Sequence, residues 1–361
     1  MTGWLAFGFT LSLIILLHEW GHFIMARRVG VKVERFSLGF GPKILGITRG
    51  DTEYAVCLFP LGGYVKMAGE SMDEGPARHP WEYRARRVGE RVAIVLAGPL
   101  INYALGFALF FAIYLVGAPL ISTRIGEVVQ DFPASEAGLR AGDRILEING
   151  KSLESWEEVT RAIHGEREKL VVTLDREGLT LTQEIKPRLQ EVTNVLGVKM
   201  KIGMIGIVPS EEVITRRYPL PLAFVKAAER VWSLTWLTLQ ALWRIGTGGL
   251  SLKESVTGPI GIFYITSSAA ALGWLSLLQL TAVLSTSIGL FNLLPVPVLD
   301  GGHLAFLFIE KARGRPVSVR AQEGMTQVGF GLLLLLLLVV TYNDLVKFKV
   351  AERIFPFFGG N

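Results

Sequence analysis

The chain has 361 residues, of which 50% are hydrophobic and 19% are charged, and its mean hydropathy is +0.41. This composition is too apolar for an ordinary soluble enzyme and fits several membrane spans around a smaller soluble part. The formal net charge of +5 is modest, and the basic residues bracket apolar segments without the interleaved aromatic residues of a nucleic-acid site, so we expect no nucleic-acid partner. Cys57 is the one cysteine, which excludes an intrachain disulfide and a cysteine-based metal site.

The first predicted element is a transmembrane helix over residues 1–26, and it contains the sequence HEWGH. A stretch of about 20 mostly apolar residues is enough to span a bilayer. Positions i and i+4 share one face of a helix, so His18 and His22 can point at one ion with Glu19 beside them. Two imidazoles on one turn are half of a zinc site, and the glutamate is the usual general base for a metal-bound water. HExxH also occurs in proteins that bind no metal, but ionisable residues at membrane depth are costly and favour a functional site.

Residues 27–91 are predicted to form a cytoplasmic β-loop region that dips into the membrane. Two Gly-rich runs flank the β-prone segment 52–59. A plain surface loop is the alternative, because irregular backbone at membrane depth is tolerated only where protein covers it. The second span is predicted over residues 92–120, and its Asn102 is expected to make a polar packing contact between helices.

A soluble α+β domain is predicted over residues 123–210, where the composition changes and short strands alternate with turns. Asn149-Gly150 is a hairpin-type turn, and Ser155 is expected to cap a helix. A small domain rich in strands has an edge that can accept an extended peptide. Residues 211–272 are predicted to form interfacial amphipathic helices, because charged residues interrupt the apolar pattern and three tryptophans follow one helical stripe.

The rest of the chain is predicted to contain two further spans. The third covers residues 274–299 and is broken near its end by Pro295 and Pro297. After it we expect a cytoplasmic loop, the fourth span and a C-terminal tail, which cover residues 300–323, 324–343 and 344–361.

Clusters of Arg and Lys place the loops 27–91 and 300–323 in the cytoplasm. The soluble domain and both termini are then extracytoplasmic, although basic residues near the C-terminus argue mildly against this. The first and third spans both run inward, so the HEWGH motif and Asp300 reach the cytoplasmic side of the membrane at similar depth. A catalytic zinc takes three protein ligands, and Asp300 is the expected third. His303 competes for this role, but it lies further along the chain and fits a supporting or packing role better.

Three motifs together resemble the site-2 protease family of intramembrane zinc metalloproteases, and most of all its bacterial regulator-of-sigma-E (RseP-like) members. They are HEWGH in the first span, Gly-Pro-x-x-Asn in the second span, and the sequence NLLPVPVLDGG that begins at Asn292. The soluble segment is similar to the PDZ domains that these proteases carry. It fits a single PDZ domain, whereas the best-known regulator-of-sigma-E proteases have two, which bears on how substrate access is gated.

The resemblance and the residue patterns agree on the fold class. We expect a polytopic α-helical membrane protein with four transmembrane helices, a membrane-associated β-hairpin region and one extracytoplasmic α+β PDZ domain. The resemblance implies a multi-pass protein of the bacterial cytoplasmic (inner) membrane with one zinc ion per chain. In this reading Glu19 is the base and proton shuttle, and the implied zinc ligands are His18, His22 and Asp300.

The resemblance also implies three substrate-contacting segments. Asn292 resembles an asparagine that holds substrate near the metal. The membrane-dipping hairpin of the family, which pairs with unwound substrate, corresponds to Gly62, Gly63 and Tyr64. A candidate carboxylate-binding loop of the PDZ domain consists of Ile202, Gly203, Met204, Ile205 and Gly206.

The expected function is hydrolysis of peptide bonds within or near the transmembrane segment of single-span membrane proteins. Substrates implied by the resemblance are anti-sigma factors, which would connect the protein to a stress response, or remnant signal peptides. The PDZ domain would gate or recruit substrate, with a C-terminus exposed by a prior cleavage as its ligand. A membrane zinc carrier or sensor is one alternative, but the spans offer few polar residues for a transport path. A non-catalytic PDZ scaffold is the other, and it would not need an intact metal site.

Overall fold

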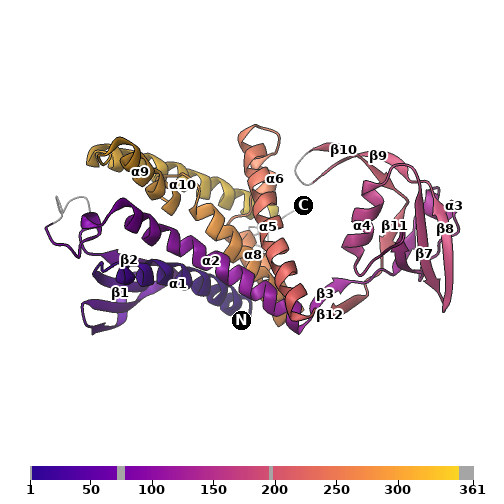
Figure 1. The fold of residues 1–361 in the computed structure, drawn as a ribbon, viewed down its shortest axis with the longest axis horizontal. Helices are drawn as coiled ribbons and strands as arrows, with labels where there is room; N and C mark the ends of the chain where they lie inside the picture. Colours follow the sequence, from indigo (N-terminus) through magenta and orange to yellow (C-terminus); the bar gives the residue numbers. More distant parts are fainter. Residues whose placement is uncertain (1, 71–77, 195–197, 349–361) are drawn as a thin grey trace, which may run out of the picture. The chain divides into compact units, whose positions relative to one another are not determined.

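The computed structural model describes residues 2–70, 78–194 and 198–348. Its chain divides into two compact units, which are taken separately below (Figure 1). The first unit draws on residues 1–113, 224–239 and 252–361, and the second on residues 114–223 and 240–251. Helix α5 (Leu220–Gly246) contributes residues to both units, and the predicted C-terminal tail lies outside the described residues from position 349 onward.

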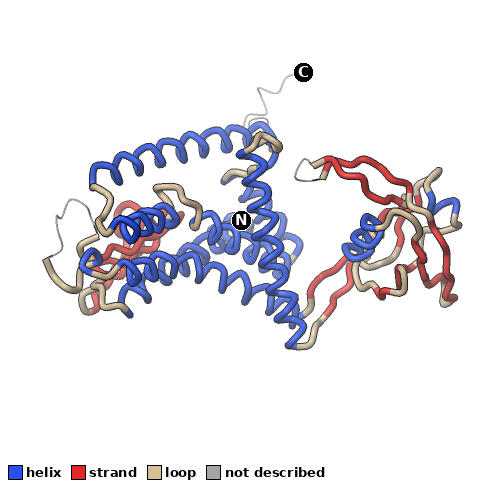
Figure 2. Tube along the Cα trace, turned by 45° about the horizontal axis from the view of Figure 1, so that its top comes forward, coloured by secondary structure: helices blue, strands red, loops and turns tan. Residues whose placement is uncertain are grey.

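The first unit consists mainly of long helices, together with one β-hairpin (Figures 1 and 2). A 3-10 turn (Tyr83–Ala85) precedes the second helix. The remaining elements are α1 (Thr2–Arg28), β1 (Val33–Arg49), β2 (Thr52–Met67), α2 (Val88–Val116), α6 (Leu252–Ser255), α7 (Pro259–Leu272), α8 (Trp274–Asn292), α9 (Asp300–Arg313) and α10 (Val319–Lys347).

Among the described residues, four helices are long and apolar enough to cross a membrane: Gly3–Arg28, Val88–Val116, Trp274–Asn292 and Val319–Lys347. This number matches the expected four spans, but the helix ends differ. The second helix ends at Val116 because Gly117 takes a φ of 139° and leads into a strand. The third ends at Asn292, before the prolines, and a new helix starts at Asp300, where the sequence predicts a loop.

Small residues let the helices of the first unit approach one another closely. A Cβ added at Gly21 of α1 would lie 2.5 Å from the carbonyl oxygen of Ala97 in α2. A Cβ at Gly106 of α2 would lie 2.2 Å from Oγ1 of Thr286 in α8. Without an aqueous driving force between helices, such close backbone packing is a main source of association. It brings the HEWGH turn of α1 directly against α2.

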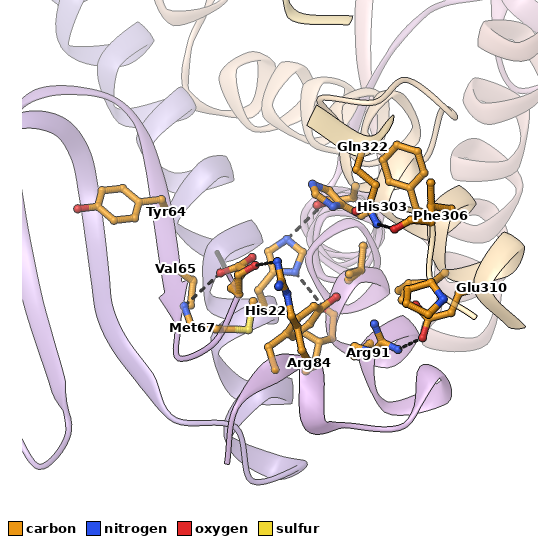
Figure 3. A pocket seen from close by; sticks show the side chains of 18 of the residues that line it. His22, Tyr64, Val65, Met67, Arg84, Arg91, His303, Phe306, Glu310 and Gln322 are labelled. Atoms are coloured by element: carbon orange, nitrogen blue, oxygen red, sulfur yellow. Dashed lines mark hydrogen bonds and ion pairs between the residues drawn. The ribbon is translucent and has the colours of Figure 1, made fainter. Parts of the chain in front are cut away.

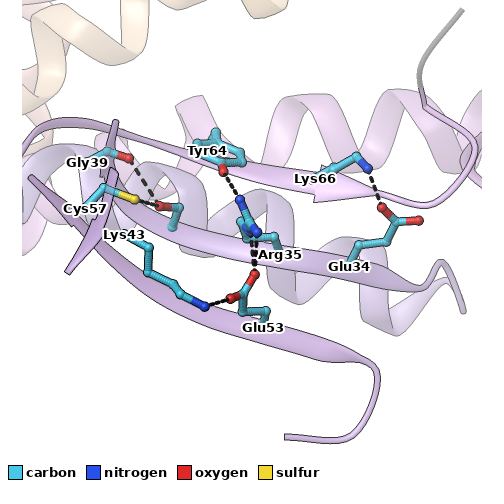
Figure 4. A network of polar contacts seen from close by, with 9 residues as sticks. Glu34, Arg35, Gly39, Lys43, Glu53, Cys57, Tyr64 and Lys66 are labelled. Carbon is cyan, nitrogen blue, oxygen red and sulfur yellow. Dashed lines mark hydrogen bonds and ion pairs between the residues drawn. The ribbon is translucent and has the colours of Figure 1, made fainter. Parts of the chain in front are cut away.

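Strands β1 and β2 form a long ladder that folds back on itself. Residues 33–38 of β1 pair with residues 63–67 of β2 on one side and with residues 53–56 on the other. Arg35 connects the two neighbours, because its Nε donates to Glu53 Oε2 at 2.6 Å and its Nη1 donates to the Tyr64 hydroxyl at 3.0 Å (Figure 4). The segment 63–67, called the edge segment below, therefore has β1 on one side only.

The second unit is rich in strands and holds its own apolar core. A four-stranded sheet has the order β6-β5-β7-β8, and its core includes Ile145, Leu170 and Val172. Ser155 accepts a hydrogen bond from the backbone N–H of Glu158 and caps α4, as its sequence position predicts. The elements are β3 (Ala118–Ile121), β4 (Ile125–Val128), α3 (Pro133–Glu136), β5 (Arg144–Ile148), β6 (Lys151–Ser152), α4 (Trp156–Gly165), β7 (Leu170–Arg176), β8 (Leu179–Ile185), β9 (Arg188–Thr193), β10 (Lys199–Met204), β11 (Ile207–Pro209) and β12 (Val213–Arg216).

The region 211–272 is more varied than a set of interfacial helices. It begins with strand β12, which pairs with β3, and continues through α5, α6 and α7. On α5 the side chains of Trp232, Trp236 and Trp243 are all exposed. Exposed indoles on one helix are what an interfacial helix needs.

An ion pair connects the residue before β5 to the end of β7 in the second unit. The Asp143 side chain is 1% exposed and receives two hydrogen bonds from Arg176, of 2.7 Å to Oδ1 and 2.8 Å to Oδ2. The Arg140 backbone N–H donates a third, at 2.8 Å. Burial by itself raises the pKa of Asp143, but the hydrogen bonds from Arg176 and Arg140 outweigh it and hold this pKa below its ordinary value.

We therefore expect Arg176→Met to destabilise the second unit, because it leaves the Asp143 carboxylate, which is 1% exposed, without its charged partner. Since the pKa of Asp143 is depressed in the folded state, the stabilisation is present at neutral pH and is lost as the pH falls through that depressed pKa. Hydrogen exchange of peptides from β5 and β7 in the full chain at neutral pH measures the effect. The double variant Arg176→Met/Asp143→Leu should recover part of the protection. Unchanged exchange in the single variant would contradict the role of the pair.

Candidate metal centre

Three potential ligand atoms converge at the HEWGH turn of α1. His18 and His22 are each 8% exposed, and their Nε2 atoms lie 3.2 Å apart. Asp300 Oδ2 lies 3.1 Å from Nε2 of His18 and 3.5 Å from Nε2 of His22, yet it makes no hydrogen bond among the described residues. These three residues form the one group of this kind found in the described part of the chain. Three potential ligand atoms this close together form a group that could hold a metal ion.

Asp300 reaches this position because the chain turns sharply between α8 and α9. A Cβ at Gly301 would lie 2.1 Å from the Leu294 carbonyl oxygen, and one at Gly302 would lie 2.4 Å from the Val296 carbonyl oxygen. Only glycine fits where the first turn of α9 packs on the preceding segment. Asp300 thus opens α9 at its N-terminus, where the helix dipole favours a negative charge. The Asp-Gly-Gly sequence therefore sets the position of the carboxylate.

Helix α2 covers the two imidazoles and orients one of them. His22 Nδ1 lies 2.9 Å from the backbone carbonyl oxygen of Ile94, an acceptor, so this nitrogen donates its proton and leaves Nε2 unprotonated. Gly98, one turn further along α2, lies against both rings, and a Cβ there would be 2.3 Å from His22 Nε2. The Gly-Pro sequence of the second span thus makes room for the histidine pair.

The ligand set fits zinc. Two imidazole nitrogens and one carboxylate oxygen are the protein ligands of many catalytic zinc sites, which leave the fourth position open. The structure has space for a fourth, non-protein ligand, because two cavities of about 490 Å³ and 240 Å³ are both lined by His18, Glu19 and Asp300. Figure 3 shows the larger cavity with His22 and His303 around it.

The edge segment of β2 runs beside Glu19. The Glu19 carboxylate accepts a hydrogen bond from the backbone N–H of Val65. A Cβ at Gly63 would lie 3.1 Å from Glu19 Cγ and 2.9 Å from the Ser37 carbonyl oxygen. The absence of a side chain at Gly63 therefore lets the strand pass directly over the glutamate.

The structure brings together most of the residues that the sequence singles out. Asn292 lines the smaller cavity with Glu19 and Asp300, whereas Tyr64 lines the larger one. Gly62 is buried, and a Cβ there would lie 2.0 Å from the ring of Phe40. His303 also lines the larger cavity, but it is not part of the three-residue ligand group.

The proposed carboxylate-binding loop belongs to the second unit, whereas the three potential metal ligands belong to the first. Ile202, Gly203 and Met204 belong to β10, which pairs with β9, and Ile205 is 1% exposed in the domain core. A Cβ at Gly203 would lie 2.4 Å from the Glu166 carbonyl oxygen at the end of α4. The segment is therefore packed against α4.

Two groups at the site were not foreseen from the sequence. Arg91 of α2 pairs with Glu310 of α9 in the wall of the larger cavity, and both side chains are mostly buried. The carbonyl of Ile94, which holds His22, carries no sequence signal because every residue has one. Asn102 makes the polar contact between helices that its sequence position predicts, because its side-chain nitrogen lies 3.3 Å from His18 Nδ1. The spacing of Ile94, Gly98 and Asn102 by four residues places all three on one face of α2 and could have revealed the contact.

Comparison with known proteins finds similarity along most of the chain. The model of peptidase family M50 matches residues 6–336. A protein named as a zinc metalloprotease in Rhizobium meliloti is 36% identical over 94% of this chain and 95% of its own length. The zinc metalloprotease RasP of Oceanobacillus iheyensis is 29% identical over 96% of this chain and 99% of its own. The regulator of sigma-E protease RseP of Escherichia coli is 29% identical over 92% and 96%, respectively. Among solved structures, the PDZ domain of an SdrC-like protein of Listeria monocytogenes aligns with 25% of this chain and 87% of its own, at 25% identity and a TM-score of 0.20.

We expect Gly98→Ala to weaken zinc binding by at least about tenfold, because the new methyl group displaces the imidazoles from their shared position. The matched control is Gly89→Ala in the same helix, where nothing lies within 4 Å of the added Cβ. The measurement is the fraction of zinc that each purified full-length variant retains as the chelator concentration is raised. Equal retention in the two variants would contradict the close packing of α2 on the histidine pair.

Proposed function

Since the chain belongs to peptidase family M50 and is a zinc metalloprotease of the site-2 type, we propose that it cleaves single-span membrane proteins within or near their transmembrane segment. The observation that carries the proposal is the convergence of His18, His22 and Asp300 on one point along a helix that can span a membrane. Ionisable groups at membrane depth are functional by default.

In this proposal His18, His22 and Asp300 hold one zinc ion per chain. The Asp300 oxygen that makes no hydrogen bond among the described residues supports this assignment, because a bound cation would satisfy it. When bound, zinc supplies Lewis acidity, which polarises a peptide carbonyl and lowers the pKa of water. The residues around it supply the proton transfers and the binding of the substrate.

Glu19 is the proposed general base. It follows His18 directly in the chain and lines both cavities, so its carboxylate reaches the same space as the ligand atoms. The carboxylate takes a proton from the attacking water and returns it to the nitrogen of the departing amine. The Val65 N–H holds the carboxylate while it carries out these transfers.

The edge segment of β2 is the proposed docking strand for substrate. A helical substrate hides its carbonyls in its own hydrogen bonds, so a stretch must unwind before hydrolysis. Addition of this stretch as a strand beside the edge segment would replace the lost hydrogen bonds. Gly63 and Tyr64 begin that segment and Gly62 directly precedes it. Asn292, which lines the smaller cavity with Glu19, would hold the peptide there.

We further propose a multi-pass protein of the bacterial cytoplasmic membrane, with the metal centre near the cytoplasmic side. The clusters of Arg and Lys in the loops support an orientation with the PDZ domain and both termini outside. Anti-sigma factors in a stress response, or remnant signal peptides, are the proposed substrates. The PDZ domain would gate or recruit them, and the segment from Ile202 to Gly206 is its proposed site for a C-terminus exposed by a prior cut.

Glu19→Gln should keep zinc and lower cleavage by at least about a hundredfold, because glutamine fills the same space but cannot accept the proton from water. Cleavage of a tagged single-span substrate by the purified full chain in detergent measures this, with wild type and chelator-treated wild type beside it. The matched control is Glu157→Gln on the exposed surface of α4, which should cleave like wild type. Retained cleavage by pure Glu19→Gln protein would contradict the role of Glu19. If wild type binds zinc but cleaves no single-span substrate, the result would favour a membrane zinc sensor.

A further inference from the structure

The side chain of Asn102 is fully buried beside the metal centre, and half of its amide has no partner. Asn102 is 0% exposed, and its Oδ1 makes no hydrogen bond among the described residues. Its Nδ2 lies 3.3 Å from Nδ1 of His18. The backbone carbonyl of Asn102 is occupied separately, because it accepts a hydrogen bond from Ser285 Oγ at 2.8 Å. A buried carbonyl oxygen without a donor is rare and needs an explanation.

The geometry of His18 determines which of its two ring nitrogens carries the proton. Its Nε2 points at His22 Nε2 and Asp300 Oδ2, so this nitrogen is the one that would face a metal. A neutral imidazole has one N–H, and a metal-binding nitrogen must be free of it. The proton of His18 therefore belongs on Nδ1, the atom beside Asn102. Nδ1 then needs an acceptor, and an amide nitrogen is not one.

We propose that Asn102 is a positioning residue whose side-chain oxygen accepts the Nδ1 proton of His18 and so keeps His18 Nε2 free for the metal. A half-turn of the amide about its Cβ–Cγ bond brings Oδ1 to the position of Nδ2. This rotation provides the acceptor that Nδ1 needs and gives the buried oxygen its donor. The inference rests on the proposed function, because it concerns the ligands of the proposed zinc ion.

Helix α2 then orients both histidines in the same way. The Ile94 carbonyl accepts from Nδ1 of His22, and Asn102 accepts from Nδ1 of His18. The two acceptors lie eight residues apart on one face of the helix, with Gly98 between them to admit the rings. The ring of His22 contacts a backbone carbonyl of α2. The ring of His18 contacts α2 two turns later, where a side chain provides the acceptor. An asparagine provides this acceptor without adding a charge to the buried site.

Two variants of nearly the same shape test the role. Asn102→Asp keeps an acceptor oxygen toward His18, and Asn102→Leu removes it. Titration of the zinc-loaded full chain in detergent with a chelator should show zinc binding weakened by about tenfold to a hundredfold in Asn102→Leu and close to wild type in Asn102→Asp. A packing role predicts the opposite order, because leucine fills the buried space and aspartate buries a charge there. Weaker binding in Asn102→Asp than in Asn102→Leu would therefore overturn the proposal.

Ser285→Ala is the matched control. It removes the hydrogen bond from α8 to the backbone of Asn102 and leaves the side-chain amide in place, so zinc binding should match wild type. Equal zinc binding in wild type and Asn102→Leu would overturn the positioning role alone. Absence of zinc from wild type would instead overturn the proposed function.

A second measurement needs no variant and so does not depend on how the variants fold. The ¹⁵N spectrum of histidine-labelled, zinc-loaded wild type distinguishes a ring protonated at Nδ1 from one protonated at Nε2. Two metal-bound rings, both protonated at Nδ1, are the expected result. A metal-bound ring protonated at Nε2 would overturn the proposal.

Discussion

The cost of placing ionisable side chains in a membrane-spanning helix is the constraint on which the rest of the structure depends. His18, Glu19 and His22 are tolerable in α1 only if surrounding groups satisfy them. The structure provides these groups from three directions: α2 covers the rings, α9 supplies a carboxylate, and the edge segment of β2 holds Glu19. Each of these contacts needs close approach, which explains the glycines at positions 21, 98, 63 and 301.

The same constraint connects the metal centre to the handling of substrate. A peptide bond at membrane depth is normally buried in the hydrogen bonds of its helix, so a protease there must offer replacements. The edge segment of β2 is positioned for this, because it is paired on one side and passes Glu19 on the other. Arg35 stiffens the ladder by bonding to the segments on both sides, Glu53 and Tyr64. Chemistry and substrate alignment thus depend on one small group of elements.

Much of this was readable from the sequence, and what was missed has a physical reason. The apolar runs gave the four long helices, and the i, i+4 histidines and Asp300 lie together as expected. The helix ends were less predictable: the segment from Pro295 to Leu299 separates two helices, and glycine packing lets α9 restart at Asp300, where a loop was expected. The partner of His22 is a backbone carbonyl, which no residue pattern marks. For Asn102 the sequence predicts a polar contact between helices, but it does not show that the partner is the ring of His18.

The most direct test of the account is X-ray absorption at the zinc edge of the purified full chain. We expect one zinc ion per chain in a shell of nitrogen and oxygen at about 2.0–2.2 Å, with the scattering pattern of two imidazoles. A sulfur neighbour at about 2.3 Å would contradict it, because that would place the metal at Cys57, which is buried in the β1–β2 ladder beside Ser37. A zinc shell with no imidazole would contradict it equally.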